Sequence, residues 1–416
     1  MGKKIKVGVF GAARGMSMIQ VLAKHPDAEL VAVCDKYEPL LNNCREMARN
    51  KDLALACYTD FELFIHHDMD AVVLANYANE HATYAIRLLH SGRHVLSEVL
   101  PMETMAQAVA LAEAVENSGK VYSYAENYCY MAATSEMKRR YRLGDIGEFR
   151  HGEGEYVHDC ELIWPSITYG ERTHWRNNFY SSFYCTHSLG PIITITGTRP
   201  VRVVGFETPN TPYMANVGYG GGTSAMEILQ MSNGATVKSL HGLLRREPSS
   251  VWFSLYGDCG MMESDRWGEG VNRVNLFQTG SPLSEKQLSY TPKPKKAGAF
   301  SGLGIGHGGG DFFTVHYFLE KILDREEGAE AIDIYQALDM AIPGLLAYRS
   351  ICNGNSPQTV PDFRDPAQRE PYRDDHWCTN ITASGRDKAP LCSFGSPDLP
   401  DSIYEAVRSQ WLGTQK

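Results

Sequence analysis

The stretch KIKVGVFGAARG, residues 4–15, decides the fold of the first part of the chain. It is a short apolar run that ends at Gly11 and continues into small residues, which predicts a buried parallel strand followed by a tight turn. Residues 16–24 then place apolar side chains at helical spacing, and residues 29–34, ELVAVC, predict a second strand. Together these segments predict one strand–helix–strand unit.

The alternation of strands and helices continues to about residue 126. We expect further helices at residues 39–50, 81–91 and 104–118, and strands at residues 70–75, 94–97 and 120–125. Each crossover helix must pack back onto the sheet, so this order predicts a doubly wound parallel sheet. Residues 1–126 are therefore predicted to form an N-terminal Rossmann domain in an α/β protein.

The pattern changes after residue 126. A predicted helix at residues 133–143 is followed by strand patterns at residues 149–156, 201–207, 224–232, 236–243 and 251–256, and by helices at residues 308–324 and 331–351. This order predicts a second α/β domain with an antiparallel sheet over residues 127–365. We expect residues 279–307, which are rich in proline and lysine, to form a surface loop or arm, and residues 366–416 to form an irregular C-terminal extension.

Composition places the chain among ordinary soluble proteins. Of its 416 residues, 43% are hydrophobic and 21% are charged, and this length favours two domains over one. The net charge of −9 argues against nucleic acid and anionic membranes as partners, because both need a basic surface, and it favours a small molecule. No run of about 18 apolar residues could span a membrane and no signal-peptide pattern opens the chain, so we expect a cytoplasmic protein. Ten cysteines without a C-x-x-C pair indicate reduced, mostly buried thiols, and no histidine spacing indicates a metal site.

The turn Gly11-Ala12-Ala13-Arg14-Gly15 is a candidate dinucleotide site. A turn of small residues between a first strand and helix lets a pyrophosphate approach the backbone N–H groups. The turn is one residue shorter than G-x-G-x-x-G, and Ala13 replaces the second glycine, so a tight turn without a ligand is the alternative. Asp35 strengthens the prediction. It ends the second strand 24 positions after Gly11 (35 − 11 = 24), where a carboxylate accepts hydrogen bonds from the adenosine ribose and repels a 2′-phosphate. The sequence therefore predicts NAD rather than NADP as the cofactor.

Several segments between residues 4 and 350 resemble the Gfo/Idh/MocA family of oxidoreductases. They are the glycine turn, Asp35, Asn79-Glu80-His81, residues 92–98 (GRHVLSE) and residues 143–147 (LGDIG). The resemblance implies a Rossmann domain followed by an α/β domain with a large open, mostly antiparallel sheet, whose face covers the nicotinamide and binds a sugar or polyol. It also implies that Asn79, His81, Glu98 and Asn127 contact NAD, and that the chain forms a homo-oligomer, either a dimer or a tetramer.

Two departures from the ordinary dehydrogenases of this family narrow the resemblance. Those enzymes carry Glu-Lys-Pro where this chain has Glu98-Val99-Leu100-Pro101, and they carry an Asp four residues before the catalytic His, where this chain has Phe183 before His187. At these positions the chain instead resembles a branch of NAD-dependent glycoside hydrolases typified by bacterial α-N-acetylgalactosaminidases. The similarity extends over residues 97–99 (SEV), 127–130 (NYCY), 156–159 (YVHD), 184–191 (YCTHSLGP) and 306–309 (GHGG). A tyrosine expected after an Arg-Pro pair is not evident in residues 246–249 (REPS), so the sugar is left open.

In that branch, NAD takes a hydride from a sugar carbon, elimination and hydration follow at the resulting 3-keto sugar, and the hydride is returned. The resemblance implies that His187, Tyr184 and Tyr156 carry the proton transfers, and an imidazole suits this work because it gains and loses a proton near neutral pH. The residues expected to contact the substrate are His158, Trp175, Arg176, His307 and Asp311. The alternatives are structural: His187 is then a capping or core histidine, Tyr156 a packed strand residue, and His158 with Asp159 a surface pair.

Three functions stay open at this point. The first is an NAD-dependent glycosidase that works through a transient 3-keto sugar. The second is a conventional NAD-dependent sugar or polyol dehydrogenase, with His187 as the base and Tyr184 in place of the lysine. The third is a non-catalytic NAD-binding sensor or structural protein, against which the dense cluster of Tyr, His and Trp side chains argues.

Overall fold

The computed structural model describes residues 4–267, 273–280, 287–293 and 306–414. Their contacts divide the chain into two compact units that alternate along the sequence. Unit 1 takes the described residues within Met1–Met131, Pro294–Leu338 and Phe363–Asp374, and unit 2 takes those within Ala132–Lys293, Asp339–Asp362 and Asp375–Lys416. The predicted domain boundaries at residues 126 and 365 stay a prediction, since each unit is assembled from more than one segment of the chain.

Unit 1 is built around a parallel sheet of six strands in the order β3-β2-β1-β4-β5-β6. The strands are β1 (Ile5–Phe10), β2 (Ala28–Cys34), β3 (Ala56–Tyr58), β4 (Ala71–Leu74), β5 (His94–Ser97) and β6 (Tyr122–Tyr124). The chain winds outward from β1 in one direction and from β4 in the other, which is the doubly wound order of dinucleotide-binding sheets. The predicted Rossmann sheet is confirmed, and β3 is a short strand that the sequence reasoning did not predict.

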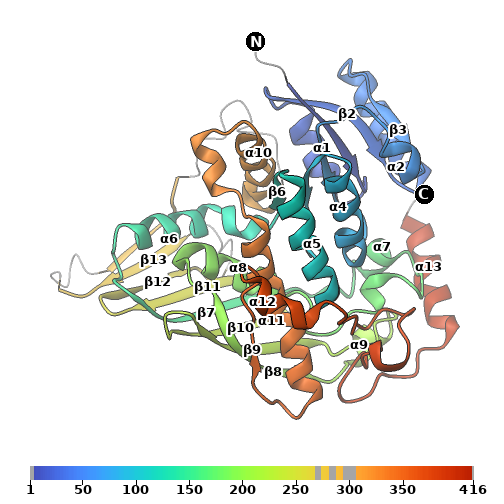
Figure 1. Ribbon diagram of the computed structural model, residues 1–416. Coiled ribbons are helices and arrows are strands. Elements are labelled where there is room, and N and C mark those ends of the chain that lie inside the picture. Colours follow the sequence, from blue (N-terminus) through green and yellow to red (C-terminus); the bar gives the residue numbers. More distant parts are fainter. Residues whose placement is uncertain (1–3, 268–272, 281–286, 294–305, 415–416) are drawn as a thin grey trace. The chain divides into compact units, whose positions relative to one another are not determined.

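Helices follow the strands of unit 1 in alternation. They are α1 (Met16–Leu22), α2 (Glu38–Asn50), α3 (Phe61–Phe64), α4 (His81–His90) and α5 (Met105–Ser118). Figure 1 shows α4 and α5 side by side over the sheet. The start of α5 is fixed by a capping box, in which the Thr104 hydroxyl accepts from the Gln107 N–H and the Gln107 side chain accepts from the Thr104 N–H.

A helix from far along the chain completes the core of unit 1. Helix α10 (Gly310–Ile322) buries Phe312, Val315 and Phe318 in the same apolar cluster as Val7 of β1 and Met18 of α1. The helix predicted at residues 308–324 is confirmed, but it belongs to unit 1 and not to the unit that precedes it in the sequence. Its first residues therefore reach the sheet that carries the glycine turn.

Unit 2 is built around a sheet in the order β14-β13-β12-β11-β7-β10-β9-β8-β15. The strands are β7 (Phe149–Val157), β8 (Pro200–Thr208), β9 (Ser224–Met231), β10 (Thr236–Gly242), β11 (Ser250–Gly257), β12 (Gly260–Ser264), β13 (Val274–Gln278), β14 (Gln287–Tyr290) and β15 (Gln358–Thr359). The pair β7–β10 is parallel and the other neighbours pair antiparallel, so the predicted mostly antiparallel sheet is confirmed.

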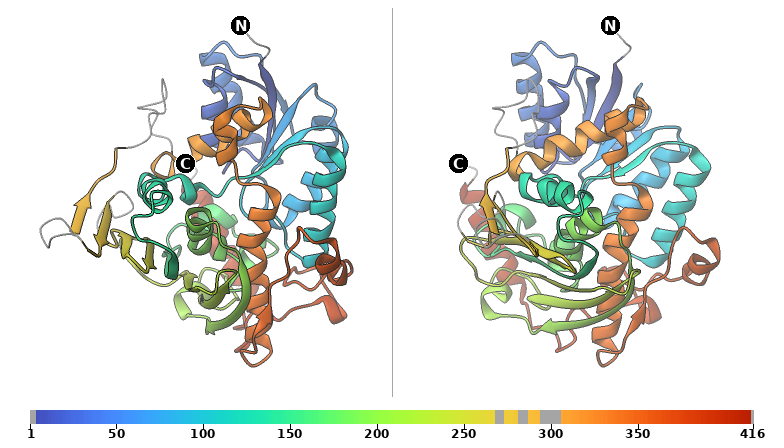
Figure 2. Two further views of the ribbon diagram at one scale, coloured as in Figure 1. Left: turned by 60° about the vertical axis from the view of Figure 1, so that its left-hand side comes forward. Right: turned by 90° about the vertical axis from the view of Figure 1, so that its left-hand side faces the viewer.

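Helices α6 (Ala132–Arg142) and α8 (Cys185–Thr196) pack on one face of this sheet. Figure 2 shows the green and yellow strands as one curved sheet with α6, drawn in teal, along one face. Helix α8 approaches β7 so closely that a Cβ at Gly154 would lie 1.8 Å from the carbonyl oxygen of Ser188. Glycine at position 154 is what allows this approach. Apolar side chains of the opposite face are exposed, among them Phe206, Ile228 and Tyr256.

Two expectations for the later part of the chain need correction. Helix α13 (Asp401–Thr414) lies in the extension predicted to be irregular, and it buries Tyr404, Val407 and Trp411, which share one helical face. Strand β14 lies within the predicted loop 279–307, and residues 281–286 and 294–305 of that loop, including Lys295 and Lys296, lie outside the described residues. The described part of α11 (Ile334–Cys352) confirms the last predicted helix. Among the described helices we find none with the length and hydropathy to cross a bilayer.

Candidate cofactor and active-site residues

The glycine turn of unit 1 is packed tightly against the end of β4. Gly11 has a φ of +98°, and a Cβ there would lie 2.3 Å from the carbonyl carbon and oxygen of Ala75. A Cβ at Gly15 would lie 2.1 Å from the carbonyl oxygen of Gly11. Both positions therefore require glycine, Gly11 for its left-handed backbone and both for space. Ala13 at the tip of the turn is exposed, whereas Ala12 is buried.

Asp35 is held at the carboxyl end of β2 by two backbone N–H groups. Its Oδ2 accepts from Ala12 N at 2.7 Å and its Oδ1 from Tyr37 N at 2.8 Å. The carboxylate is only partly buried, and each oxygen keeps a second lone pair. Asp35 is thus fixed beside the glycine turn with the capacity to accept further hydrogen bonds, which is the arrangement that recognises ribose hydroxyls.

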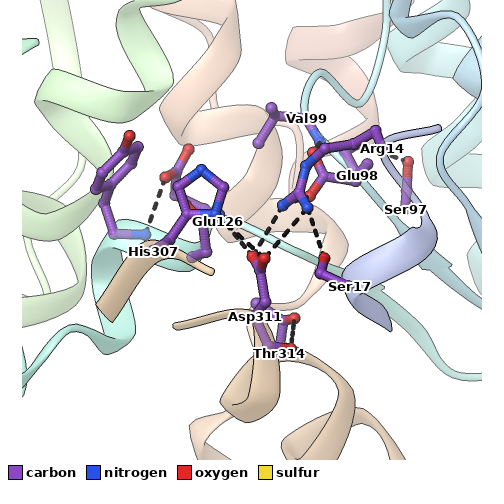
Figure 3. A network of polar contacts seen from close by, with 11 residues as sticks. Arg14, Ser17, Ser97, Glu98, Val99, Glu126, His307, Asp311 and Thr314 are labelled. Carbon is purple, nitrogen blue, oxygen red and sulfur yellow. Dashed lines mark hydrogen bonds and ion pairs between the residues drawn. The ribbon is translucent and has the colours of Figure 1, made fainter. Parts of the chain in front are cut away.

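Arg14 of the turn joins two carboxylates that are far from it in the sequence (Figure 3). Its Nη2 donates to Glu98 Oε1 at 2.6 Å and to Asp311 Oδ1 at 2.8 Å, and its Nη1 donates to Asp311 Oδ2 at 3.2 Å and to Ser17 Oγ at 2.8 Å. Burial alone would lower the pKa of Arg14, but the charges of Glu98 and Asp311 raise it above its ordinary value. The guanidinium is therefore a permanent cation here, and it binds residues 98 and 311 to the turn.

The carboxylate of Asp311 contacts the side chains of three residues. Besides Arg14, its Oδ2 lies 3.1 Å from Nδ1 of His307, and Asn127 Nδ2 donates to its Oδ1 at 2.9 Å. Burial would raise the pKa of Asp311, but the hydrogen bond to His307 and the charge of Arg14 hold it well below its ordinary value. The ring of His307 also meets the edge of the Tyr128 ring, with centroids 5.9 Å apart. Asp311 and His307, predicted to contact substrate, thus lie with the predicted cofactor residues Arg14, Glu98 and Asn127.

The two ring nitrogens of His81 differ, because Nδ1 is hydrogen-bonded to the backbone and Nε2 is buried without a hydrogen-bond partner among the described residues. Its side chain is buried, its Nδ1 lies 2.8 Å from the carbonyl oxygen of Leu100, and burial lowers its pKa to about 4. This neutral imidazole anchors the segment that follows Glu98. Its predicted contact with NAD stays a prediction.

Unit 1 contains buried hydrogen-bond acceptors that a dinucleotide could satisfy. Within the described part of the chain, Oδ1 of Asn76, of Asn79 and of Asn127 is buried without a hydrogen-bond partner. Asn76 and Asn79 follow β4 and Asn127 follows β6, so these acceptors lie beyond the carboxyl ends of the strands, where doubly wound sheets bind their ligands. Buried acceptors without partners are costly, and a ligand with hydroxyl and amide donors would satisfy them. The residues therefore fit NAD.

Unit 2 brings the three predicted catalytic residues together. Tyr184 directly precedes α8 and His187 lies in its first turn, while Tyr156 lies on β7 beneath the helix. The centroid of the His187 ring is 4.6 Å from that of Tyr156 and 5.5 Å from that of Tyr184, to which it is nearly parallel at 21°. His187 is buried, and both tyrosines are partly exposed.

The predicted substrate residues of unit 2 surround the same cluster. Arg176 Nη1 donates to the Tyr184 hydroxyl oxygen at 3.1 Å, and its guanidinium lies 4.4 Å from the centroid of the Trp175 ring. His158 Nδ1 is 3.5 Å from the Tyr156 hydroxyl, a long contact. Burial lowers the pKa of His158; Asp159 opposes this shift, and Arg176 adds to it. We call Tyr156, His158, Arg176, Tyr184 and His187 the Tyr–His cluster.

The sequence reasoning did not predict the position of Asn76 or the burial of Phe183. Asn76 was overlooked, although an asparagine two positions after a buried parallel strand is a signal that the sequence offers. Phe183, which stands where related dehydrogenases carry Asp, is buried with its ring 6.1 Å from that of Trp175. Trp175 itself packs among such aromatic rings and is buried, so it supports the cluster from within.

The fold of unit 1 and the residues of both units define an NAD-dependent enzyme. Residues 5–126 match the family described as "Oxidoreductase family, NAD-binding Rossmann fold", and residues 133–368 match "Glycosyl hydrolase 109, C-terminal domain". The chain belongs to glycosyl hydrolase family 109. These matches confirm the predicted family, its glycosidase branch and the cofactor.

Curated relatives agree with this assignment, and solved structures share the fold. The chain is 24% identical over 405 residues to "Glycosyl hydrolase family 109 protein 1" of Phocaeicola vulgatus, covering 86% of this chain and 84% of that protein. It is 23% identical over 395 residues to the "Alpha-N-acetylgalactosaminidase" of Shewanella oneidensis, covering 86% and 85%. Among solved structures, levoglucosan dehydrogenase in complex with NADH and levoglucosan superposes with a TM-score of 0.70 at 17% identity, covering 86% of this chain and 100% of that chain. An oxidoreductase from Agrobacterium radiobacter, in complex with NAD+, L-tartaric acid and magnesium, also gives a TM-score of 0.70, at 16% identity and with 87% and 99% covered.

Proposed function

We propose that the protein hydrolyses a glycoside through a transient 3-keto sugar, with no net oxidation of the substrate. The residues of unit 1 would hold NAD, which would supply the hydride acceptor and donor that such a cycle needs. The observation that carries the proposal is Val99. It stands where the dehydrogenases that this chain resembles carry a lysine, and an apolar side chain cannot polarise a reacting hydroxyl. The proton transfers then fall to the Tyr–His cluster.

The Tyr–His cluster can move the protons that such a cycle requires. A hydroxyl proton must leave when the sugar carbon is oxidised, the neighbouring C2 proton must leave before elimination, and the departing oxygen must gain a proton. An imidazole nitrogen of His187 suits the first role, because it accepts and donates protons near neutral pH. The Tyr184 oxygen accepts a hydrogen bond from Arg176, so its own hydrogen can be donated and a negative charge on that oxygen is stabilised. Tyr156, with its ring beside His187, is the second phenol in reach of the imidazole.

We assign the remaining predicted residues to binding. The backbone of residues 11–15 would hold the pyrophosphate, Asp35 the adenosine ribose, and Asn79, Asn127 and Glu98 the rest of NAD. His158, Arg176 and the supporting Trp175 would bind the sugar. Asp311 and His307 would act indirectly, since Asp311 holds both Arg14 and Asn127.

Assembly, partners and location are also proposals. The exposed apolar side chains Phe206, Ile228 and Tyr256 on one sheet face support a homo-oligomer, a dimer or tetramer. The ten cysteines, all within the described residues, are thiols and form no disulfide there, which supports a reducing compartment such as the cytoplasm. The net charge of −9 supports a small-molecule partner over nucleic acid.

The test is an assay without added cofactor. The purified protein is first analysed for co-purifying NAD and then offered a panel of nitrophenyl glycosides. Release of nitrophenol without accumulation of NADH supports the proposal. Stoichiometric NADH formation from a free sugar would contradict it and favour the conventional dehydrogenase, whereas bound NAD with neither activity would favour a non-catalytic NAD-binding protein.

A further inference from the structure

A buried chain of polar side chains in unit 2 has no role in the mechanism above. Glu227 on β9 has none of its side chain exposed, and its Oε1 lies 2.7 Å from Nε2 of His241 on β10. Its Oε2 accepts from Ser239 Oγ at 2.7 Å, and Ser239 Oγ lies 2.8 Å from Ser188 Oγ on α8. All four residues are buried. We call these four residues the Glu227 chain.

The Glu227 chain ends beside the Tyr–His cluster. Ser188 follows His187 in the first turn of α8, and its carbonyl lies directly over Gly154 of β7. Ser239 pairs in register with Gly154, and His241 pairs with Tyr156, two residues further along the same parallel strands. Side chains two apart on a strand share a face. The Glu227 chain therefore reaches α8, which holds His187, and β10, the strand that pairs with the Tyr156 strand β7.

The direction of the hydrogen bonds follows from their chemistry. A carboxylate accepts but does not donate, so the one hydroxyl hydrogen of Ser239 is directed at Glu227. Ser188 has one hydroxyl hydrogen and two acceptors in reach, Ser239 Oγ at 2.8 Å and the carbonyl oxygen of Cys185 in the same turn at 3.0 Å, so this hydrogen is shared between them. Two hydrogen bonds in series thus connect the first turn of α8 to the carboxylate of Glu227.

Stability alone gives little reason for this arrangement. Burying a carboxylate is costly, and replacing a buried ion pair by apolar residues of similar volume is often neutral or stabilising. The neighbours of the chain on the same sheet face, Val237 and Leu229, show that the site accepts aliphatic side chains. A satisfied polar network, in contrast, fixes one geometry.

We propose that Glu227 is a positioning residue for the catalytic cluster: through Ser239 and Ser188 it fixes the imidazole of His187 over Tyr156, and through His241 it fixes the strand beside Tyr156. This inference rests on the proposed function only for its kinetic consequence. The orientation of His187 is a property of the free protein.

The first experiment needs no substrate. The full chain is labelled with ¹³C at histidine Cε1, and the signal of His187 among the 14 histidines is identified by its loss in His187→Gln. Ser239→Ala and Ser188→Ala each break the link with little change in volume. Ser254→Ala is the matched control, because Ser254 is equally buried in the same sheet and its hydroxyl has no hydrogen-bond partner among the described residues. We expect the chemical shift of the His187 signal to change in both link variants and to stay unchanged in the control. Superimposable His187 signals in all four proteins would overturn the proposal.

The second experiment measures turnover of a nitrophenyl glycoside by the same variants. Loss of one hydrogen bond of this link should lower kcat about tenfold in each link variant, with KM within about twofold. The double variant should be no slower than either single variant, because both changes break one connection. An unchanged kcat in a link variant, or additive losses in the double variant, would also refute the proposal. If no glycoside is hydrolysed at all, the proposed function fails, and the histidine spectra still decide this inference.

Discussion

Replacement of Asp311 by Asn tests the network of unit 1. The carboxylate accepts from two nitrogens of Arg14 and from Asn127, and its Oδ2 lies 3.1 Å from His307 Nδ1. An amide of the same shape offers one acceptor oxygen and adds two donors, so at least one of these groups loses its partner and no cavity forms. Breaking one partner from a buried ion pair costs about 3–5 kcal/mol. Arg14 keeps Glu98 and is 31% exposed, so we expect a smaller loss, about 2 kcal/mol.

This loss should lower the unfolding temperature of the protein by about 2 °C in calorimetry, because the unfolding entropy of 416 residues is about 0.9 kcal/mol/K. Glu62→Gln is the control, because it removes a carboxylate from an ion pair of the same unit that is exposed, Arg87–Glu62 at 2.7 Å, and should leave the unfolding temperature unchanged. Since Arg14 lies in the turn assigned to the pyrophosphate, Asp311→Asn should also purify with less NAD. An unfolding temperature equal to that of the wild type or of the Glu62 variant would refute the reasoning.

Other substitutions probe single features. Gly11→Ala should lose NAD and unfold at lower temperature because its Cβ meets the Ala75 carbonyl, while Gly413→Ala, which meets nothing within 4 Å, should behave as wild type in both measurements. Asp35→Ser should bind NAD more weakly and NADP more tightly in titrations, and an unchanged preference would remove Asp35 from the ribose site. His187→Gln should lower kcat at least about 100-fold without changing NAD content, and a normal rate would exclude it as the proton carrier. Burial lowers the pKa of His81 to about 4, so the folded state binds its proton less readily than the unfolded state. The contribution of His81 is therefore complete above about pH 6.5 and is lost as the pH falls toward 4, costing up to about 3 kcal/mol in denaturant titrations, and His81→Asn should flatten that dependence.

Local sequence patterns were sufficient for the glycine turn and for the strands and helices of unit 1 before residue 126, except the short elements β3 and α3. Alternating apolar runs fix strands and helices over a few residues, and the demand for glycine at positions 11 and 15 arises within one turn. The motifs around His187 and Tyr156 likewise mark the cluster by sequence alone, because the resemblance is carried by short contiguous segments. Helix α13 was missed because its three buried residues follow a stretch rich in proline and aspartate.

The sequence by itself therefore determined a Rossmann unit, a unit with a mostly antiparallel sheet, the cofactor and the residue types of the candidate site. Only the tertiary structure decided which of these residues act on one another. Arg14 and Asp311 are 297 positions apart, and nothing in either local pattern shows that α10 returns to the glycine turn. In the sequence, Glu227 is one polar residue on a predicted strand. Its burial beneath α8 follows from the register of β9 and β10 and from the close approach of α8 at Gly154. Periodicity determines which side of an element is apolar, whereas ion pairs between distant segments depend on how the whole chain packs.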